Sequence, residues 1–374
     1  MNNNRFHDKL RPMSADIAPK VGIIIPTKDR PDFMIRQLEY YAKAKSPHSV
    51  YISDASNDVN SKKLQRAIQG FSERLTINYS YKPHYTVPEA NLDLYRRVKE
   101  KYTTTVGDDD YQIPASLTKC AEFLENNPIY SSASGRSVSV RILGNGAHGE
   151  IKRIAYYPLH QIEDITASRR LLGLMANYSP TAFAINRTEQ MVKCWDYKHS
   201  AQDMGFAYEL IPHGLSLIWG KTKVLDCLSL VRQFDNQKRV SPNTLEWLTS
   251  KNWHSSYGAY CEILAKEISG IDGISIYEAR KITEQSVWIY LNIWLPFDYK
   301  KTYGSGTTDS KIPGSLLRKL RLHIGQSLPR LKNIYTQMRH SLPNAPQDLS
   351  YEVTRPSSIY YEDFRPVLDS IEGK

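Results

Sequence analysis

Short apolar runs alternate with helix-like segments along the first third of the chain. Val21 to Thr27 is a continuous apolar run of the kind that forms a buried parallel strand. In chain order the pattern predicts strands at 21–27, 49–53, 75–81 and just before 108, with helices at 31–45, 61–70, 88–101 and 114–126. Strands that alternate with helices predict a mostly parallel sheet flanked by helices, the α/β class.

Polar clusters follow three of these predicted strands. The first is Thr27 to Pro31, the second is Asp54 to Asp58, and the third begins at Asp108. Open α/β sheets hold their ligands at the carboxyl ends of the strands. We therefore expect Thr27, Asp54 and Asp108 to border one crevice.

The third cluster contains three successive carboxylates, Asp108, Asp109 and Asp110, after the β-branched run 103–106 and Gly107. Pro114 stands where the next helix could begin. Three adjacent like charges repel, so we expect a cation among them, and a hard divalent ion that itself holds a diphosphate suits them best. The alternative is a solvated acidic turn in front of a helix N-terminus.

Length and composition limit the function classes. The 374 residues suggest about two domains, and 41% hydrophobic residues without an apolar run near a bilayer span indicate a soluble protein. The N-terminal segment lacks the apolar core of a signal peptide, so we expect a cytoplasmic location. Four scattered cysteines, with no CxxC pair, predict buried reduced thiols rather than a disulfide or zinc framework.

A net charge of +10 favours an anionic partner: nucleotide phosphates, a lipid diphosphate, a membrane surface or nucleic acid. Much of it comes from residues 311–340, which are rich in Lys and Arg, lack acids and repeat leucine. Such a basic amphipathic helix can lie on an anionic membrane surface. Equally, it can pack on the catalytic domain or on a partner.

The series IIIPTKDRP, YISDASND and VGDDDYQIP resembles the nucleotide-sugar half of GT-A fold glycosyltransferases, and most closely the inverting, bacterial family 2-like enzymes with a DxD or DDD motif. The resemblance covers roughly residues 20–130 and continues more weakly to about 235. It implies an α/β, Rossmann-like GT-A fold with a largely helical C-terminal extension. The expected division is a lead-in at 1–20, a catalytic domain at 21–235 and a helical region at 236–374.

The resemblance also implies which residues hold the donor. Asp54 would accept from the ring N–H of a pyrimidine, and the acids at 108–110 would hold the ribose and Mn2+ or Mg2+. A literal DxD pattern pairs Asp108 with Asp110, whereas counting back from Pro114 favours Asp109 as the main metal ligand with Asp108 on the ribose. All three are expected to line the site. The expected nucleotide-binding residues are Pro26, Thr27, Asp29, Arg30, Asp54, Asp108 and Asp109.

A catalytic base is expected at Asp203. Enzymes of the resembling family carry an [ED]-D pair that opens a helix roughly ninety residues past the metal motif, and here Gln202 replaces the first acid. A base must take the proton of the acceptor hydroxyl as that oxygen attacks the anomeric carbon. Asp203 is also a plausible helix N-cap. Glu209, six residues further on, is the alternative base.

The expected function is a metal-dependent, hexosyltransferase-type enzyme that transfers a sugar from a nucleoside diphosphate donor, such as a UDP-sugar, to a hydroxyl of a glycan or lipid-linked glycan. Bacterial surface polysaccharide synthesis is the expected setting. No QxxRW-like motif is present, which favours single addition over processive synthesis; Arg232 lies in the nearest basic segment. The alternatives are a nucleotidyltransferase, although residues 26–30 contain no Gly, and a non-enzymatic basic surface-binding protein. No nucleic-acid partner is expected.

Overall fold

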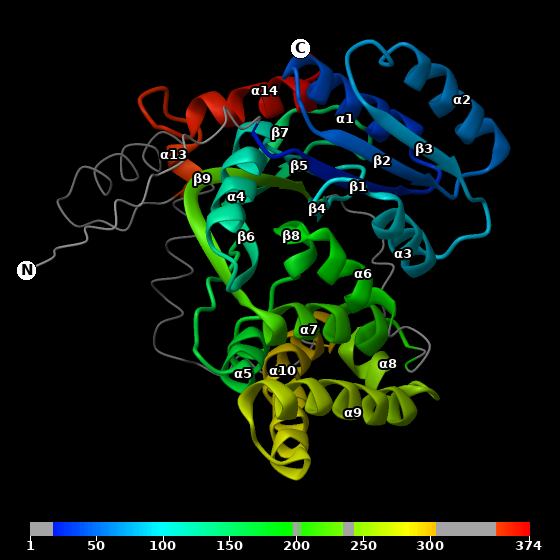
Figure 1. Ribbon diagram of the computed structural model, residues 1–374. Coiled ribbons are helices and arrows are strands. Elements are labelled where there is room, and N and C mark those ends of the chain that lie inside the picture. Colours follow the sequence, from blue (N-terminus) through cyan, green and yellow to red (C-terminus); the bar gives the residue numbers. More distant parts are fainter. Residues whose placement is uncertain (1–17, 197–200, 202, 235–242, 304–348) are drawn as a thin grey trace, which may run out of the picture.

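The computed structural model describes residues 18–196, 201, 203–234, 243–303 and 349–374. They form one nine-stranded sheet with helices on both faces (Figure 1). The strands are β1 (Val21–Thr27), β2 (Ser49–Asp54), β3 (Ile77–Tyr81), β4 (Tyr102–Thr105), β5 (Tyr111–Gln112), β6 (Tyr130–Ile142), β7 (Ile151–Tyr156), β8 (Ile185–Arg187) and β9 (Lys221–Gln233).

Helices connect and cover these strands. Pro stands in the first turn of α1 and α4, where its missing N–H costs nothing. The helical elements are α1 (Pro31–Lys43), α2 (Asp58–Gln69), α3 (Val87–Arg97), α4 (Pro114–Asn126), α5 (Ala167–Ala176), the 3₁₀ turn η1 (Thr181–Phe183), α6 (Thr188–Asp196), the π-helix η3 (Phe206–Leu210), α7 (Ile211–Trp219), α8 (Thr244–Leu248), α9 (Trp253–Asp272), α10 (Ile276–Tyr303), α13 (Leu349–Glu352) and α14 (Tyr361–Glu372).

The sheet runs in the order β3-β2-β1-β4-β8-β6-β9-β5, with β7 paired to β6. Its first four strands are parallel, which confirms the expected alternation of strands and helices. Strands β8, β7 and β5 join as antiparallel partners, so the whole sheet is mixed. The α/β class and the helical region after residue 243 are confirmed for the described residues.

Two apolar cores lie on the two faces of this sheet. Side chains alternate along β1, so Ile23 and Ile25 enter one core while Ile24 enters the other. The first core includes residues of α1, α4 and α14; α14 lies beside α1 in Figure 1 although the two are far apart in sequence. The second core joins α3 and α5–α7 to α9 and α10.

This packing bears on the expected domain division. Helices α9 and α10 share their core with α5 and α7, which precede residue 235, while α14 returns to the core of β1. The boundary at 235 stays a prediction, and it does not coincide with a boundary between the two cores. The basic segment 311–340 lies outside the described residues.

Some local expectations are corrected. The apolar pattern of residues 181–185 predicts a strand, but Thr181–Phe183 form a 3₁₀ turn and the short strand β8 starts at Ile185. All four cysteines are free and buried, as expected. Within the described part of the chain, no helix is both long and apolar enough to cross a membrane.

The sequence around Arg169 and Arg170 predicts solvated arginines, with contact to phosphate as the alternative, but Arg170 is a structural residue. It is 5% exposed, and its guanidinium donates to the carbonyl oxygens of Leu217 (2.6 Å), Ile218 (2.6 Å), Asp164 (3.1 Å) and Ile165 (2.7 Å). These bonds satisfy carbonyls at the end of α7, which no intrahelical donor can reach. The side chain thereby ties α5 to the end of α7.

We predict that Arg170→Leu lowers the free energy of unfolding by about 2 to 4 kcal/mol, because the carbonyls that it leaves lose charged donors in a buried place. Urea unfolding followed by circular dichroism measures this loss. The neighbouring Arg169 is exposed, so Arg169→Leu is the matched control and should cost less than about 0.5 kcal/mol. Equal effects of the two substitutions would contradict the structural role of Arg170.

Candidate functional site

The three acids lie in the turn between β4 and β5, at the carboxyl edge of the parallel strands. Val106 N–H donates to Ile24 O (3.0 Å), which continues the pairing of β4 with β1 one residue past the strand. Thr27 stands opposite Asp54 in the register of β1 and β2. The expected convergence of the three strand ends is therefore present in the structure.

Asp108 and Asp109 are bridged by one arginine. Arg30 Nη1 lies 2.7 Å from Asp108 Oδ1, and Arg30 Nη2 lies 3.0 Å from Asp109 Oδ2. Thr27 Oγ1 donates to the other oxygen of Asp108 (2.7 Å). Burial raises the pKa of Asp108 to about 7; Arg30 and Thr27 oppose the rise, and Asp109 adds to it. Asp108 is therefore a buried carboxyl with a raised pKa, and it lies beside the more exposed Asp109.

Asp110 is turned away from this pair and holds β9. Its carboxylate accepts from Arg232 Nε (3.1 Å) and from the backbone N–H of Gln233 (2.9 Å). Burial raises the pKa of Asp110 to about 6, against the opposing effect of Arg232. Arg232 also donates to Tyr157 Oη (3.0 Å) and lies over the ring of Phe183 at 4.4 Å. Asp110, an expected metal ligand, is thus only 1% exposed, and it links the acidic turn to β9.

Two side chains of helix α1 donate hydrogen bonds to the backbone of the acidic turn. Arg36 Nη2 donates to Asp109 O (3.1 Å), and Gln37 Nε2 donates to the carbonyl oxygens of Gly107 (3.0 Å) and Asp110. Gly107 is tightly enclosed, because a Cβ there would lie 2.9 Å from Asp109 Oδ1. Both α1 side chains are buried. They fix the direction in which the acids project.

The second strand end is also organised by hydrogen bonds. Asp54 is fully buried and accepts from Ser56 N–H (2.9 Å) and Tyr79 Oη (2.7 Å). Asp29 has a positive φ of 56° and accepts from Asn57 N–H (2.9 Å), while its own N–H donates to Ser56 Oγ (2.7 Å). These bonds join the first loop, residues 27–31 after β1, to the second loop, residues 54–58 after β2. A direct contact of Asp54 with a nucleobase stays a prediction, and it would require the groups that cover this fully buried side chain to move.

Asp203 precedes the π-helix η3, and π-helical turns occur often at functional sites. Its Oδ1 accepts from Phe206 N–H (2.8 Å) and Trp247 Nε1 (2.7 Å), so the capping alternative is part of what it does. Its Oδ2 is buried and has no partner among the described residues. Buried carboxylate oxygens without donors are costly and call for an explanation. The flanking Gln202 lies outside the described residues.

Glu209 lies within η3, and its side chain is 44% exposed. Tyr178 Oη donates to Glu209 Oε2 (2.7 Å) and lies 2.8 Å from His213 Nδ1. Because the hydroxyl proton goes to Glu209, we assign the Nδ1–H tautomer to His213, which leaves its buried Nε2 without a partner in the described chain. Burial lowers the pKa of His213 to about 3, so this imidazole is neutral.

Tyr157 lies beside the acidic turn through its bond with Arg232. Burial raises the pKa of Tyr157; Arg232 opposes the rise, and both Asp110 and Glu209 add to it. Arg232 bonds both Asp110 and Tyr157, so these three side chains form one hydrogen-bonded group at the strand edge.

Sequence reasoning missed several residues that build the site. Arg36, Gln37, Tyr79, Tyr157 and Tyr178 carry no motif signal. Only the apolar periodicity of α1 could have placed Arg36 and Gln37 toward the core, where polar side chains are not expected.

The donor chemistry at the acidic turn suits a hard cation in part. Asp109 has an 18%-exposed side chain whose only bonding partner among the described residues is Arg30, whereas Asp108 and Asp110 are nearly covered. Among those residues no group of three or more His, Cys, Asp or Glu side chains is arranged to hold a metal. Asp109 therefore fits best as a carboxylate ligand, with Arg30 as the group that a cation would have to displace.

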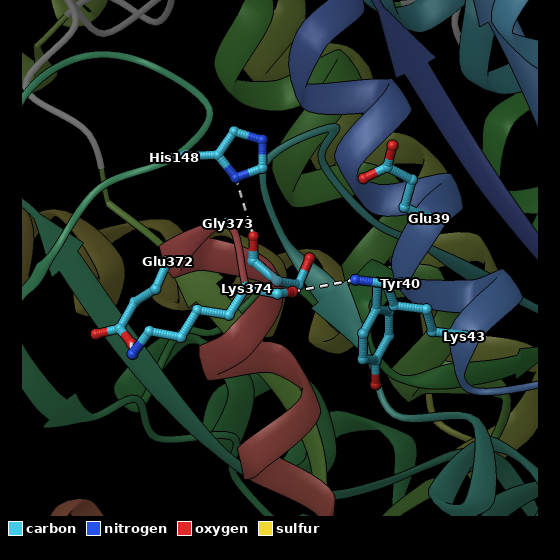
Figure 2. A pocket seen from close by; sticks show the side chains of 8 residues that line it. Glu39, Tyr40, Lys43, His148, Glu372, Gly373 and Lys374 are labelled. Atoms are coloured by element: carbon cyan, nitrogen blue, oxygen red, sulfur yellow. Dashed lines mark hydrogen bonds and ion pairs between the residues drawn. The ribbon is translucent and has the colours of Figure 1, made fainter.

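A cavity of about 520 Å³ lies elsewhere, between α1 and α14 (Figure 2). Lys43 of α1 donates through Nζ to Lys374 O (3.1 Å), while the side chains of Lys374 and Glu372 pair with each other on the side away from α1. None of its lining residues belongs to the strand-end loops or to the acidic turn. It is thus separate from the candidate site.

Comparison with known proteins finds no matching family model and no matching curated protein. Solved structures similar to the chain include S. aureus TarS 1–349 in complex with UDP-GlcNAc, at 14% identity over 79% of this chain and 77% of that chain, with a TM-score of 0.49. Mannosyltransferase PcManGT from Pyrobaculum calidifontis, in complex with GDP-Man and Mn2+, has 10% identity over 86% and 84%, with a TM-score of 0.39. Similarity at this level does not assign an activity.

We predict that stability falls as the pH drops from about 6.5 toward 3, partly because of His213. Its imidazole gains a proton in the unfolded chain over this window but stays neutral in the fold, which costs up to about 1.4 kcal/mol per pH unit. Urea unfolding at several pH values should show a shallower dependence in His213→Gln. The exposed His254 provides the control, and His254→Gln should keep the wild-type slope. Parallel curves for wild type and His213→Gln would refute this.

Proposed function

We propose that the protein is a metal-dependent, inverting glycosyltransferase that moves a sugar from a nucleoside diphosphate donor, such as a UDP-sugar, to a hydroxyl of a glycan acceptor. One observation carries the proposal. The ends of β1, β2 and β4 meet at one edge, where Thr27 and Arg30 bind the Asp108 carboxylate and Asp109 stays accessible. Ligand sites of open α/β sheets lie at this edge.

The donor would lie over the joined first and second loops. Asp29 and Asn57 hold these loops together, and Asp54 with Tyr79 fixes the second one. The guanidinium of Arg30 has the planar fork that binds phosphate oxygens, so a diphosphate can take it from the acids. A divalent ion on Asp109 would neutralise charge on the leaving diphosphate when bound.

Asp203 is the proposed base. Phe206 N–H and Trp247 Nε1 hold one oxygen in place, and the other, which has no partner among the described residues, would accept the proton of the acceptor hydroxyl. A base held by two donors keeps its orientation during the reaction. Glu209, already bonded to Tyr178, is then proposed to position the acceptor.

Donor hydrolysis is the first test. We predict that a panel of UDP- and GDP-sugars with Mn2+ reveals at least one donor that is slowly hydrolysed, and that Asp109→Asn slows this at least about 100-fold, because it removes the carboxylate proposed to hold the ion. Asp196→Asn changes an exposed acid on α6 and should have no effect. If no nucleotide binds or reacts, or if Asp109→Asn behaves as wild type, the proposed function is wrong.

The two candidate bases can be separated by kinetics. We predict that Asp203→Asn lowers kcat about 10² to 10⁴-fold with unchanged donor affinity, because its amide oxygen can still cap Phe206 while its basicity is lost. Glu209→Gln should mainly raise the KM of the acceptor. Transfer assays against donor and acceptor concentration distinguish them. The opposite pattern would assign the base to Glu209.

A further inference from the structure

A run of aromatic rings leads away from the two candidate bases. Tyr290 of α10 contacts Tyr178 edge-on, with ring centroids 5.2 Å apart, and Trp247 of α8 at 6.2 Å. Trp294 follows one turn later on α10, 6.1 Å from Tyr290, and Phe297 lies 5.8 Å from Trp294. Aromatic residues at such helical spacing more often form core than ligand contacts.

The inner end of this run is bonded to both acids. Trp247 Nε1 donates to Asp203 Oδ1 (2.7 Å), and Tyr178 Oη donates to Glu209 Oε2 (2.7 Å). Trp247 also packs on Phe206 in η3 at 4.8 Å. The aromatic run therefore begins at the groups that would receive the acceptor hydroxyl.

Its outer end is open. Phe297 is 55% exposed and Trp294 is half-buried, so apolar ring surface reaches solvent there. Trp294 Nε1 is buried and has no hydrogen-bond partner among the described residues, unlike Trp247. An indole N–H that is held out of water without an acceptor costs free energy, unless a ligand supplies the acceptor.

We propose that Trp294 and Phe297 form an acceptor subsite for a pyranose ring, so that the acceptor is a carbohydrate chain whose reactive sugar lies at Asp203 and whose next sugar lies on α10. This inference rests on the proposed function. The exposed ring of Phe297 and the half-buried ring of Trp294 offer apolar surface to the C–H face of a sugar. Trp294 Nε1 is covered in the free protein, so a sugar hydroxyl would have to displace the groups over it to supply the acceptor that this N–H lacks. A purely apolar lipid tail would leave that donor without a partner.

The test measures binding directly, without turnover. The probes are p-nitrophenyl glycosides of glucose, galactose, mannose and N-acetylglucosamine, followed by saturation-transfer NMR with and without UDP. We expect at least one glycoside to bind, with affinity lowered about tenfold in Trp294→Leu and about threefold in Trp294→Phe, which keeps a ring but loses the N–H. Trp288 of the same helix is 62% exposed and lies outside the run, so Trp288→Leu is the matched control and should bind as wild type.

Several results would overturn the subsite. These are no glycoside binding to wild type, unchanged affinity in both Trp294 variants, or an equal loss in Trp288→Leu. Binding of octanol at Trp294 without binding of any glycoside would instead assign the surface to a lipid tail and also overturn it. UDP binding is measured in parallel: its failure contradicts the proposed function, whereas normal UDP binding with unchanged glycoside affinity contradicts the subsite alone.

Discussion

Charge compensation of three adjacent carboxylates is the constraint on which the site depends. Unpaired, these side chains would repel one another and resist burial. Two guanidinium groups compensate the negative charge: Arg30 from the first loop pairs with Asp108 and Asp109, and Arg232 from β9 pairs with Asp110. Each pair also ties a distant segment to the acidic turn. The ion pairs that compensate the charge of the acids therefore also hold the segments of the site together.

The two arginines have different functional consequences. Arg232 lies among aromatic rings and binds a fully buried acid, so it maintains the architecture. Arg30 lies over the ring of Phe33 at 3.9 Å and binds the pair that includes the more exposed Asp109. A diphosphate can compete with Asp108 and Asp109 for Arg30, whereas taking Arg232 would leave the buried Asp110 without its charged partner. The first loop is therefore the part of the site that can respond to a ligand.

Part of this arrangement could be predicted from the sequence. The apolar run before Thr27 and the β-branched run before Asp108 are local signals, and strand–helix alternation places their ends at one edge. The Arg232–Asp110 pair could not be predicted, because it joins β9 to a turn residue 122 positions earlier in the chain. Arg170 looked solvated because nothing local shows that carbonyls of α7 need its donors. The return of α14 to α1 likewise depends on packing across almost the whole chain.

The central claim is that a nucleotide binds where the first three loops meet. Hydrogen exchange of the full chain with and without UDP-GlcNAc and Mn2+ tests it most directly. Protection is expected in residues 27–30, 54–58 and 106–112, because a bound ligand would add contacts to the loops that Arg30 and Asp29 join. Protection absent from these segments, or confined to the cavity between α1 and α14, would contradict it.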